Sequence, residues 1–145
     1  MLRNLPGAVR HGALLVVLLS VALATPIGAV TLQLGSSPEI PAARGAVRLK
    51  HTKNGNVEIM LRVKHLAPPG RIAPGADVFV VWVRGLAPGA EAQNLGALQV
   101  DKNLSGKLTA VTAMSSFDLF LTCEQSQTTT APSYPELLPV HYVNK

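Results

Sequence analysis

Aliphatic and charged residues alternate on both sides of an Asn54-Gly55 turn signal, and no other feature constrains the fold of this chain as strongly. In residues 47–50 and 57–64 every odd-numbered residue is aliphatic. A period of two predicts two β-strands that each bury one face. A two-residue loop would pair Leu49 with Met60 and mix the faces. A three-residue loop of residues 53–55, with Gly55 in the left-handed conformation, pairs Leu49 with Ile59. This register keeps the aliphatic side chains on one face of the hairpin and the charged side chains on the other.

The rest of the chain after residue 44 also reads as short strands between turns. Residues 78–83 are entirely apolar, which predicts a central strand buried on both faces with Trp82 as the core anchor. We expect residues 95–100 and 107–111 to form a second hairpin, and residues 117–124 to bury one face through Cys123. Pro139 predicts that residues 137–143 form an edge strand. The proline-rich residues 67–75 and the polar residues 125–135 are predicted loops.

Regular turn signals between about seven short strands predict an all-β fold. We expect an antiparallel, immunoglobulin-like β-sandwich over residues 45–145, with a closed barrel as the alternative.

The N-terminus has the pattern of a secretory signal peptide. Arg3 and Arg10 precede an apolar run over residues 13–24, which ends in the cleavage pattern Ala22-Leu23-Ala24. A second possible cleavage pattern, Ile27-Gly28-Ala29, follows a few residues later. We expect a signal peptide over residues 1–24 and a linker over residues 25–44, so that the domain is periplasmic or extracellular. The alternative is an uncleaved anchor that holds the domain outside the cytoplasm, although Pro26 and Gly28 interrupt the apolar stretch.

Composition narrows the class of protein further. Removal of the leader with its two arginines lowers the formal charge from +5 to +3, and only 4% of the residues are aromatic, so we expect no nucleic-acid partner. Cys123 is the only cysteine of a chain that we expect to be exported, so no disulfide is expected to stabilise the domain.

Three strings resemble the extracytoplasmic domain of anti-sigma-K-type regulators, over roughly residues 76–143. They are Phe79-Val80-Val81-Trp82-Val83, then Asn94-Leu95-Gly96-Ala97-Leu98, then Phe117-Asp118-Leu119-Phe120-Leu121-Thr122-Cys123-Glu124 with Pro132 downstream. The resemblance implies a sandwich fold and an envelope location. Such regulators carry a sigma-binding segment before a membrane helix, whereas only residues 1–12 precede the apolar run here. We therefore expect an isolated outer domain, similar to small free-standing exported bacterial proteins.

Catalytic and metal-binding patterns are weak. Cys123 continues an apolar strand face, which predicts an inert buried thiol. A copper site would draw on Cys123, His51, His65, His141, Met60 and Met114, but neither His nor Met closely follows the cysteine. Glycine-rich phosphate loops and a Gly-x-Ser-x-Gly nucleophile motif are absent from the sequence. We expect no catalytic residues, metal or cofactor, with a small hydrolase or metal-dependent enzyme using His141, Cys123 or Asp118 as the alternative.

Basic residues gather on the predicted first hairpin. Arg48, Lys50, Arg62 and Lys64 share its outer face, with Lys53 in the turn and Glu58 as the one acid. Such a face serves solubility and discourages edge pairing, or it binds an anionic envelope polymer, lipid headgroups or an acidic protein patch. The sequence therefore predicts an exported, non-catalytic, envelope-associated module with a binding or structural role. A regulatory or sensory domain related to anti-sigma factors is the further alternative.

Overall fold

A computed structural model of the chain describes residues 28–133 and 135–145. The predicted signal peptide, residues 1–24, lies outside the described residues. Across the described ranges, no helix has the length and apolar character that a bilayer crossing needs.

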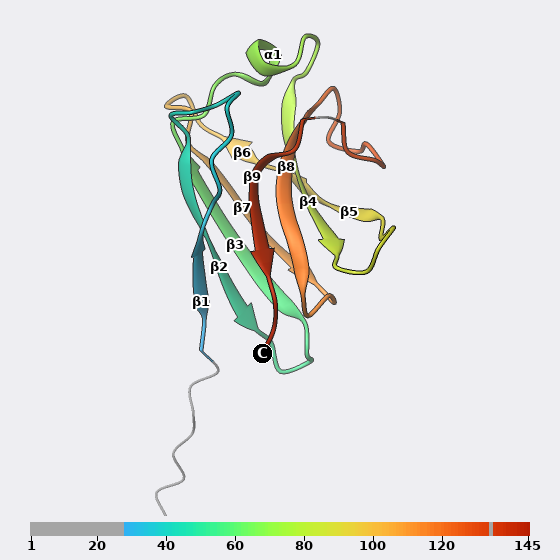
Figure 1. Cartoon of the computed structure of the whole chain (residues 1–145). Coiled ribbons are helices and arrows are strands. Elements are labelled where there is room, and N and C mark those ends of the chain that lie inside the picture. The colour runs from blue at the N-terminus through green and yellow to red at the C-terminus, as the bar shows by residue number, and fades with distance from the viewer. Residues whose placement is uncertain (1–27, 134) are drawn as a thin grey trace, which may run out of the picture.

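Two antiparallel sheets face each other (Figure 1). The first has the order β1 (Val30–Gln33), β2 (Arg44–His51), β3 (Val57–Lys64), β7 (Gly106–Thr112) and β6 (Gln99–Val100). The second has the order β5 (Ala92–Ala97), β4 (Val78–Gly85), β8 (Phe117–Glu124) and β9 (Leu137–Tyr142). The order β2-β3-β7-β6 corresponds to strands A-B-E-D of an immunoglobulin sandwich, and β5-β4-β8-β9 corresponds to C′-C-F-G. The predicted all-β, immunoglobulin-like sandwich is confirmed, and β1 adds a strand beside β2.

The first hairpin has the predicted register. Leu49 pairs with Ile59, and Lys50 pairs with Glu58. Gly55 has φ +80°, and the backbone N–H of Thr52 donates to the carbonyl of Asn56. The left-handed glycine therefore closes the three-residue loop that keeps the aliphatic side chains on one face.

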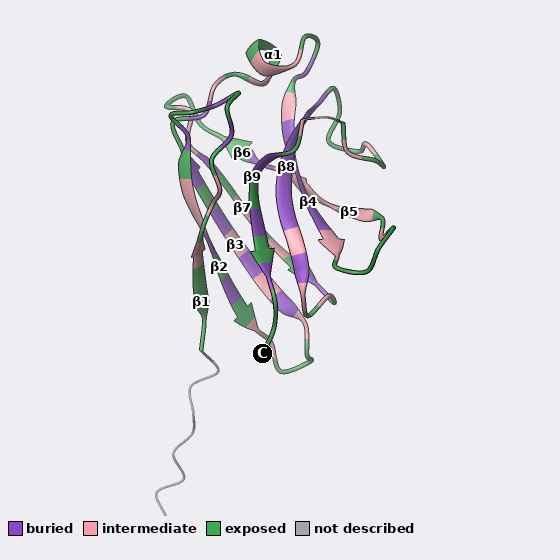
Figure 2. Ribbon diagram, in the orientation of Figure 1, coloured by how far each residue is buried: buried purple, intermediate pink, exposed green. Residues whose placement is uncertain are grey.

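The core lies between the sheets, where the odd-numbered residues of β2, β3, β4 and β8 meet (Figure 2). β4 is buried on both faces as predicted: its odd-numbered residues face the main core, and Val80 and Trp82 belong to a second apolar cluster on the opposite face. β9 is the edge strand that Pro139 predicts.

The expected linker over residues 25–44 is corrected by β1. Val30 pairs with Leu49 and Leu32 with Val47, so this segment belongs to the first sheet. Leu32 packs on the core, and Ile40 and Ala43 are buried in the turn that follows. Val30, Leu32 and Leu34 alternate with Thr31 and Gln33, but this pattern is short and directly follows the apolar leader, so the sequence alone predicts a linker here.

The second hairpin also differs from the prediction, because residues 95–100 do not form one strand. β5 pairs with β4 in one sheet, whereas β6 pairs with β7 in the other. Gly96 has φ +120°, and Leu98 is buried between the two strands with its N–H bonded to the carbonyl of Phe79. A glycine bend followed by one buried residue thus moves the chain between sheets.

The proline-rich loop contains one short helix, α1 (Pro69–Ile72).

Candidate functional site

The outer face of the five-stranded sheet carries the basic residues that the sequence singles out. Arg48 and Lys50 project from β2, and Arg62 and Lys64 project from β3, all of them exposed. Their inward-facing neighbours Val47, Leu49, Leu61 and Val63 are buried in the core. Burial of the alternate residues holds the four cations on one surface, because a strand sends successive side chains to opposite faces.

Two further cations belong to this surface. Arg44 lies opposite Lys64 in the register of β2 with β3, and Lys107 of β7 lies opposite Arg62. We call the six residues Arg44, Arg48, Lys50, Arg62, Lys64 and Lys107 the basic face. Arg44 was missed because its segment was assigned to a linker. Lys107 was missed because the sequence does not reveal that β7 pairs with β3.

The basic face has little internal neutralisation. Glu58 is its one acid, and it lies opposite Lys50. Within residues 28–133 and 135–145, the ion pairs closer than 4 Å are Arg84 with Glu136 and His141 with Asp118, and neither involves the basic face. Arg44 instead donates to the carbonyls of Pro41 and Ala43, at 2.6 and 2.7 Å. The face therefore presents a positive potential to solvent.

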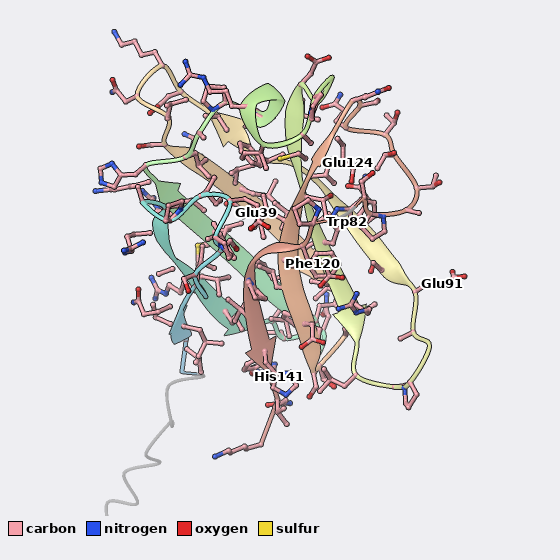
Figure 3. All side chains as sticks on the ribbon, turned by 45° about the horizontal axis from the view of Figure 1, so that its top comes forward. Glu39, Trp82, Glu91, Phe120, Glu124 and His141 are labelled. Atoms are coloured by element: carbon pink, nitrogen blue, oxygen red, sulfur yellow. The ribbon has the colours of Figure 1, made fainter. Side chains whose placement is uncertain are left out.

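Trp82 is fully buried, but it does not lie between the sheets. Together with Val80 and Phe120 it forms a second apolar cluster on the outer side of the four-stranded sheet (Figure 3). Trp82 lies opposite Phe120, and the guanidinium of Arg84 lies 4.7 Å from the centre of the Phe120 ring. Side chains alternate along β4, so its even-numbered residues face away from the main core and need a cover of their own.

A buried hydrogen-bond network runs beside this cluster. The indole N–H of Trp82 donates to the hydroxyl of Thr122 at 2.8 Å, and that hydroxyl donates to the carboxylate of Glu124. Glu124 is 4% exposed and also accepts from the N–H and the hydroxyl of Ser133. Asn94 of β5 donates to the carbonyls of Gln127 and Thr129. These hydrogen bonds attach the loop after β8 to β8 itself through Glu124 and to β5 through Asn94. The one signal of this network in the sequence is the pair of polar residues, Thr122 and Glu124, at the end of an apolar strand.

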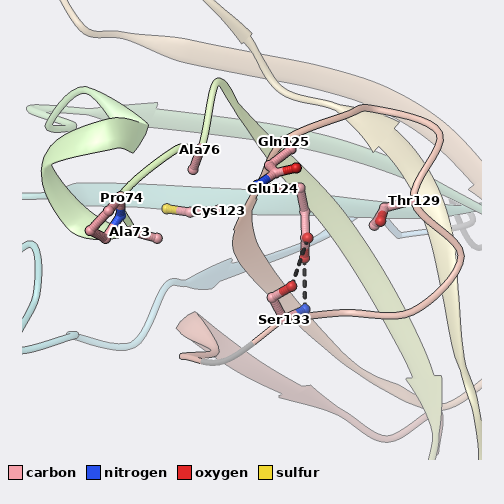
Figure 4. A pocket seen from close by; sticks show the side chains of 8 residues that line it. All are labelled: Ala73, Pro74, Ala76, Cys123, Glu124, Gln125, Thr129 and Ser133. Carbon is pink, nitrogen blue, oxygen red and sulfur yellow. Dashed lines mark hydrogen bonds between the residues drawn. The ribbon is translucent and has the colours of Figure 1, made fainter.

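Cys123 and Glu124 line a cavity of about 290 Å³ between the α1 loop and the loop after β8 (Figure 4). Burial raises the pKa of the Cys123 thiol to about 11, and the nearby charge of Glu124 adds to the increase. A thiol in this state is a poor nucleophile because so little thiolate is present at neutral pH.

The residues of the alternative catalytic hypothesis are only partly brought together. His141 Nδ1 lies 2.7 Å from a carboxylate oxygen of Asp118, on the outer side of the four-stranded sheet. Cys123 belongs to the main core and occupies the other end of β8, so it cannot join that pair. His51 bonds to the hydroxyl of Tyr142 at 3.0 Å. Among the described residues, no three His, Cys, Asp or Glu side chains lie close enough together to hold a metal ion.

Comparison with known proteins assigns the chain to no family. No family model matches it, and no curated protein is similar to it in sequence.

Proposed function

We propose that the protein is an exported, non-catalytic binding module whose basic face holds an anionic polymer of the cell envelope. The observation that carries the proposal is the single-sign surface: six cations on three adjacent strands share one face with one acid, Glu58. The export pattern of residues 1–24 supports the envelope as the location.

A polymer fits this surface better than a membrane does. Proteins that lie on membranes insert aromatic and large aliphatic side chains beside their cations. The outward positions of β1, β2, β3 and β7 hold no aromatic residue. Their large apolar side chains are Met60, which is half-exposed between Arg48 and Thr109, and Val111, which is 52% exposed opposite Glu58. One exposed valine beside an acid is less apolar surface than membrane insertion uses. Neighbouring strands lie about 4.8 Å apart and alternate residues about 7 Å apart, so the cations form a lattice that a chain of repeated anionic groups can follow.

The test is retention of the purified chain on an immobilised glycerol phosphate polymer, with a neutral dextran column as the blank. We expect binding that weakens steeply with salt, because exposed charges are screened over about 10 Å at 0.1 M ionic strength. The variant combines Arg48→Gln, Lys50→Gln, Arg62→Gln and Lys64→Gln. The matched control combines Lys53→Gln, Arg71→Gln, Lys102→Gln and Lys145→Gln, which removes four exposed charges away from the face.

We expect the face variant to lose at least about tenfold in affinity and the control less than about threefold, because charge contacts fall off with distance. Equal losses would mean that net charge alone drives binding, which would overturn the proposal. Tighter binding to phosphatidylglycerol vesicles than to the polymer would assign the face to lipid instead.

A small hydrolase is a second candidate, and the pair of His141 with Asp118 favours it. The carboxylate occupies Nδ1, so the imidazole presents Nε2 to solvent from a side chain that is 63% exposed. The histidine base of a Ser-His-Asp triad has this arrangement, in which a carboxylate orients the ring. Hydrolysis of p-nitrophenyl acetate that His141→Gln abolishes and Asp118→Asn reduces would support this function. Equal rates of hydrolysis for the unchanged protein and the two variants would rule out this second function.

A further inference from the structure

Three neighbouring strands place three polar side chains in one row of the basic face. Arg62 of β3 lies opposite Lys107 of β7, and Lys107 lies opposite Gln99 of β6. All three residues are exposed. On the other side of Arg62 the row continues with Ala46, whose short side chain leaves the guanidinium uncovered.

Arg62 and Lys107 form a like-charge pair across two strands. Like charges that lie directly opposite each other on neighbouring strands destabilise a sheet. Lys50 on the same face has Glu58 as its opposite neighbour, whereas this pair has no acid in its row. An anion bound between the two cations would relieve their repulsion.

Shallow hollows lie on both sides of the row. One, of about 250 Å³, extends toward Lys64 and the turn at Asp101 and Ser105. The other, of about 380 Å³, extends along Leu108 and Thr109. Arg62, Gln99 and Lys107 line both hollows, so the row is the ridge that separates them.

Asp101 is the one acid beside these hollows, and the turn already engages it. One of its carboxylate oxygens accepts from the N–H groups of Asn103 and Ser105, at 2.9 and 3.0 Å. These bonds hold the carboxylate against its own backbone rather than over the row. The row therefore keeps its positive character.

We propose that Arg62, Lys107 and Gln99 form the principal anion subsite of the basic face, and that the subsite takes a phosphate diester within the polymer chain. This inference rests on the proposed function and names its ligand. A guanidinium offers paired donors that match phosphate oxygens, the ammonium adds a point charge, and the amide adds a neutral donor. A diester has two arms that leave the phosphorus in different directions, and the two hollows receive one arm each.

The experiment compares two double variants on the glycerol phosphate polymer. Arg62→Gln with Lys107→Gln removes the subsite. Arg48→Gln with Lys50→Gln removes one arginine and one lysine from the same face and is the matched control. The emission of Trp82, the only tryptophan, checks that each protein is folded. We expect the subsite variant to lose at least about tenfold in affinity and the control less than about threefold, as for a contact that adds paired charge-assisted hydrogen bonds.

Separate outcomes test the inference and the proposed function. Equal losses for the two double variants would overturn the subsite and leave the basic face as the binding surface. Unchanged affinity in both would overturn the basic face as well. Polyglutamate provides the carboxylate comparison, and binding as tight as that of the phosphate polymer would overturn the assignment of phosphate.

A stability measurement supplies a readout independent of binding. Lys107→Gln without polymer should unfold at a higher urea concentration than the unchanged protein, because the like-charge pair is gone. Lys50→Gln should unfold at the same or a lower concentration, because it loses the attraction of Glu58. A lower midpoint for Lys107→Gln would contradict the repulsion on which the subsite is argued.

Discussion

The carboxylate of Glu124 accepts two hydrogen bonds from Ser133, one from the backbone N–H at 2.7 Å and one from the hydroxyl at 2.9 Å. The two partners are nine positions apart in the chain, so these bonds close the loop that follows β8. Thr122 connects the same carboxylate to the indole of Trp82. The loop and the outer apolar cluster are therefore stabilised as one unit.

Thr122→Val should lower the free energy of unfolding by about 2 to 4 kcal/mol, because two buried polar groups, on Trp82 and Glu124, each lose a partner. Thr122→Ser keeps the hydroxyl and should cost only about 1 kcal/mol, for one buried methyl group. Urea denaturation followed by the fluorescence of Trp82 measures both. A valine variant as stable as the serine variant would show that the network contributes little.

Glu124→Ala should cost about 2 to 4 kcal/mol, because it leaves Thr122 and Ser133 without their acceptor in a site that is 4% exposed. Glu91→Ala is the control, since Glu91 is exposed, and it should change stability by less than about 0.5 kcal/mol. Proteolysis should also cut the loop after β8 faster in the Glu124 variant. Identical cleavage patterns in the two variants would contradict the role of Glu124 in closing the loop.

Cys123 should react slowly with iodoacetamide in the folded protein and rapidly in urea. With a pKa of about 11, on the order of one thiol in a thousand is ionised at pH 8, and only the thiolate attacks. Cys123→Ala provides the blank for labelling. Equal labelling rates in the folded and unfolded protein would contradict the burial.

The same pKa makes stability depend on pH. Because the folded thiol holds its proton more tightly than the unfolded one, the unfolded chain binds fewer protons between about pH 9 and 11, and stability falls as pH rises through this window. Lysines and tyrosines titrate there too, so the measurement is the difference in unfolding midpoint between the unchanged protein and Cys123→Ala. As pH rises, the midpoint of the unchanged protein should fall relative to that of Cys123→Ala. A difference that stays constant with pH would contradict the prediction.

Gly45→Ala should destabilise the domain by at least about 1 to 3 kcal/mol, as overpacking does elsewhere. A methyl group there would clash with the carbonyl oxygen of Arg62 and would lie 2.7 Å from a methyl carbon of Leu34. Gly85→Ala is the matched control in another strand, because its nearest neighbour would be Ala90 at an ordinary 3.7 Å. Thermal unfolding of the two variants tests the contrast, and similar melting temperatures would contradict it.

Local patterns predicted much of the fold. The register of β2 with β3 followed from parity and from one glycine, because a period of two excludes loops with an even number of residues and Gly55 fits the left-handed position of a three-residue loop. The four cations Arg48, Lys50, Arg62 and Lys64 followed from the same parity. Burial of β4 on both faces followed from its unbroken apolar run.

Features that depend on distant pairing could not be found in this way. The strand β1 is short and mixed in character, and its place depends on β2. The change of sheet at Leu98 depends on where β4 and β7 lie. The burial of Trp82 was expected, but the sequence does not show which face of β4 lies in the main core, because both faces are apolar.

The sequence by itself determined which side chains of each strand point the same way, because the pleat of a strand makes that a local property. It thereby determined an all-β fold and one cationic hairpin surface. Only the tertiary structure decided which strands lie beside each other, because nonlocal hydrogen bonds and packing select the partners. That choice set Lys107 opposite Arg62, and it linked Trp82 through Thr122 to Glu124, which binds the loop after β8.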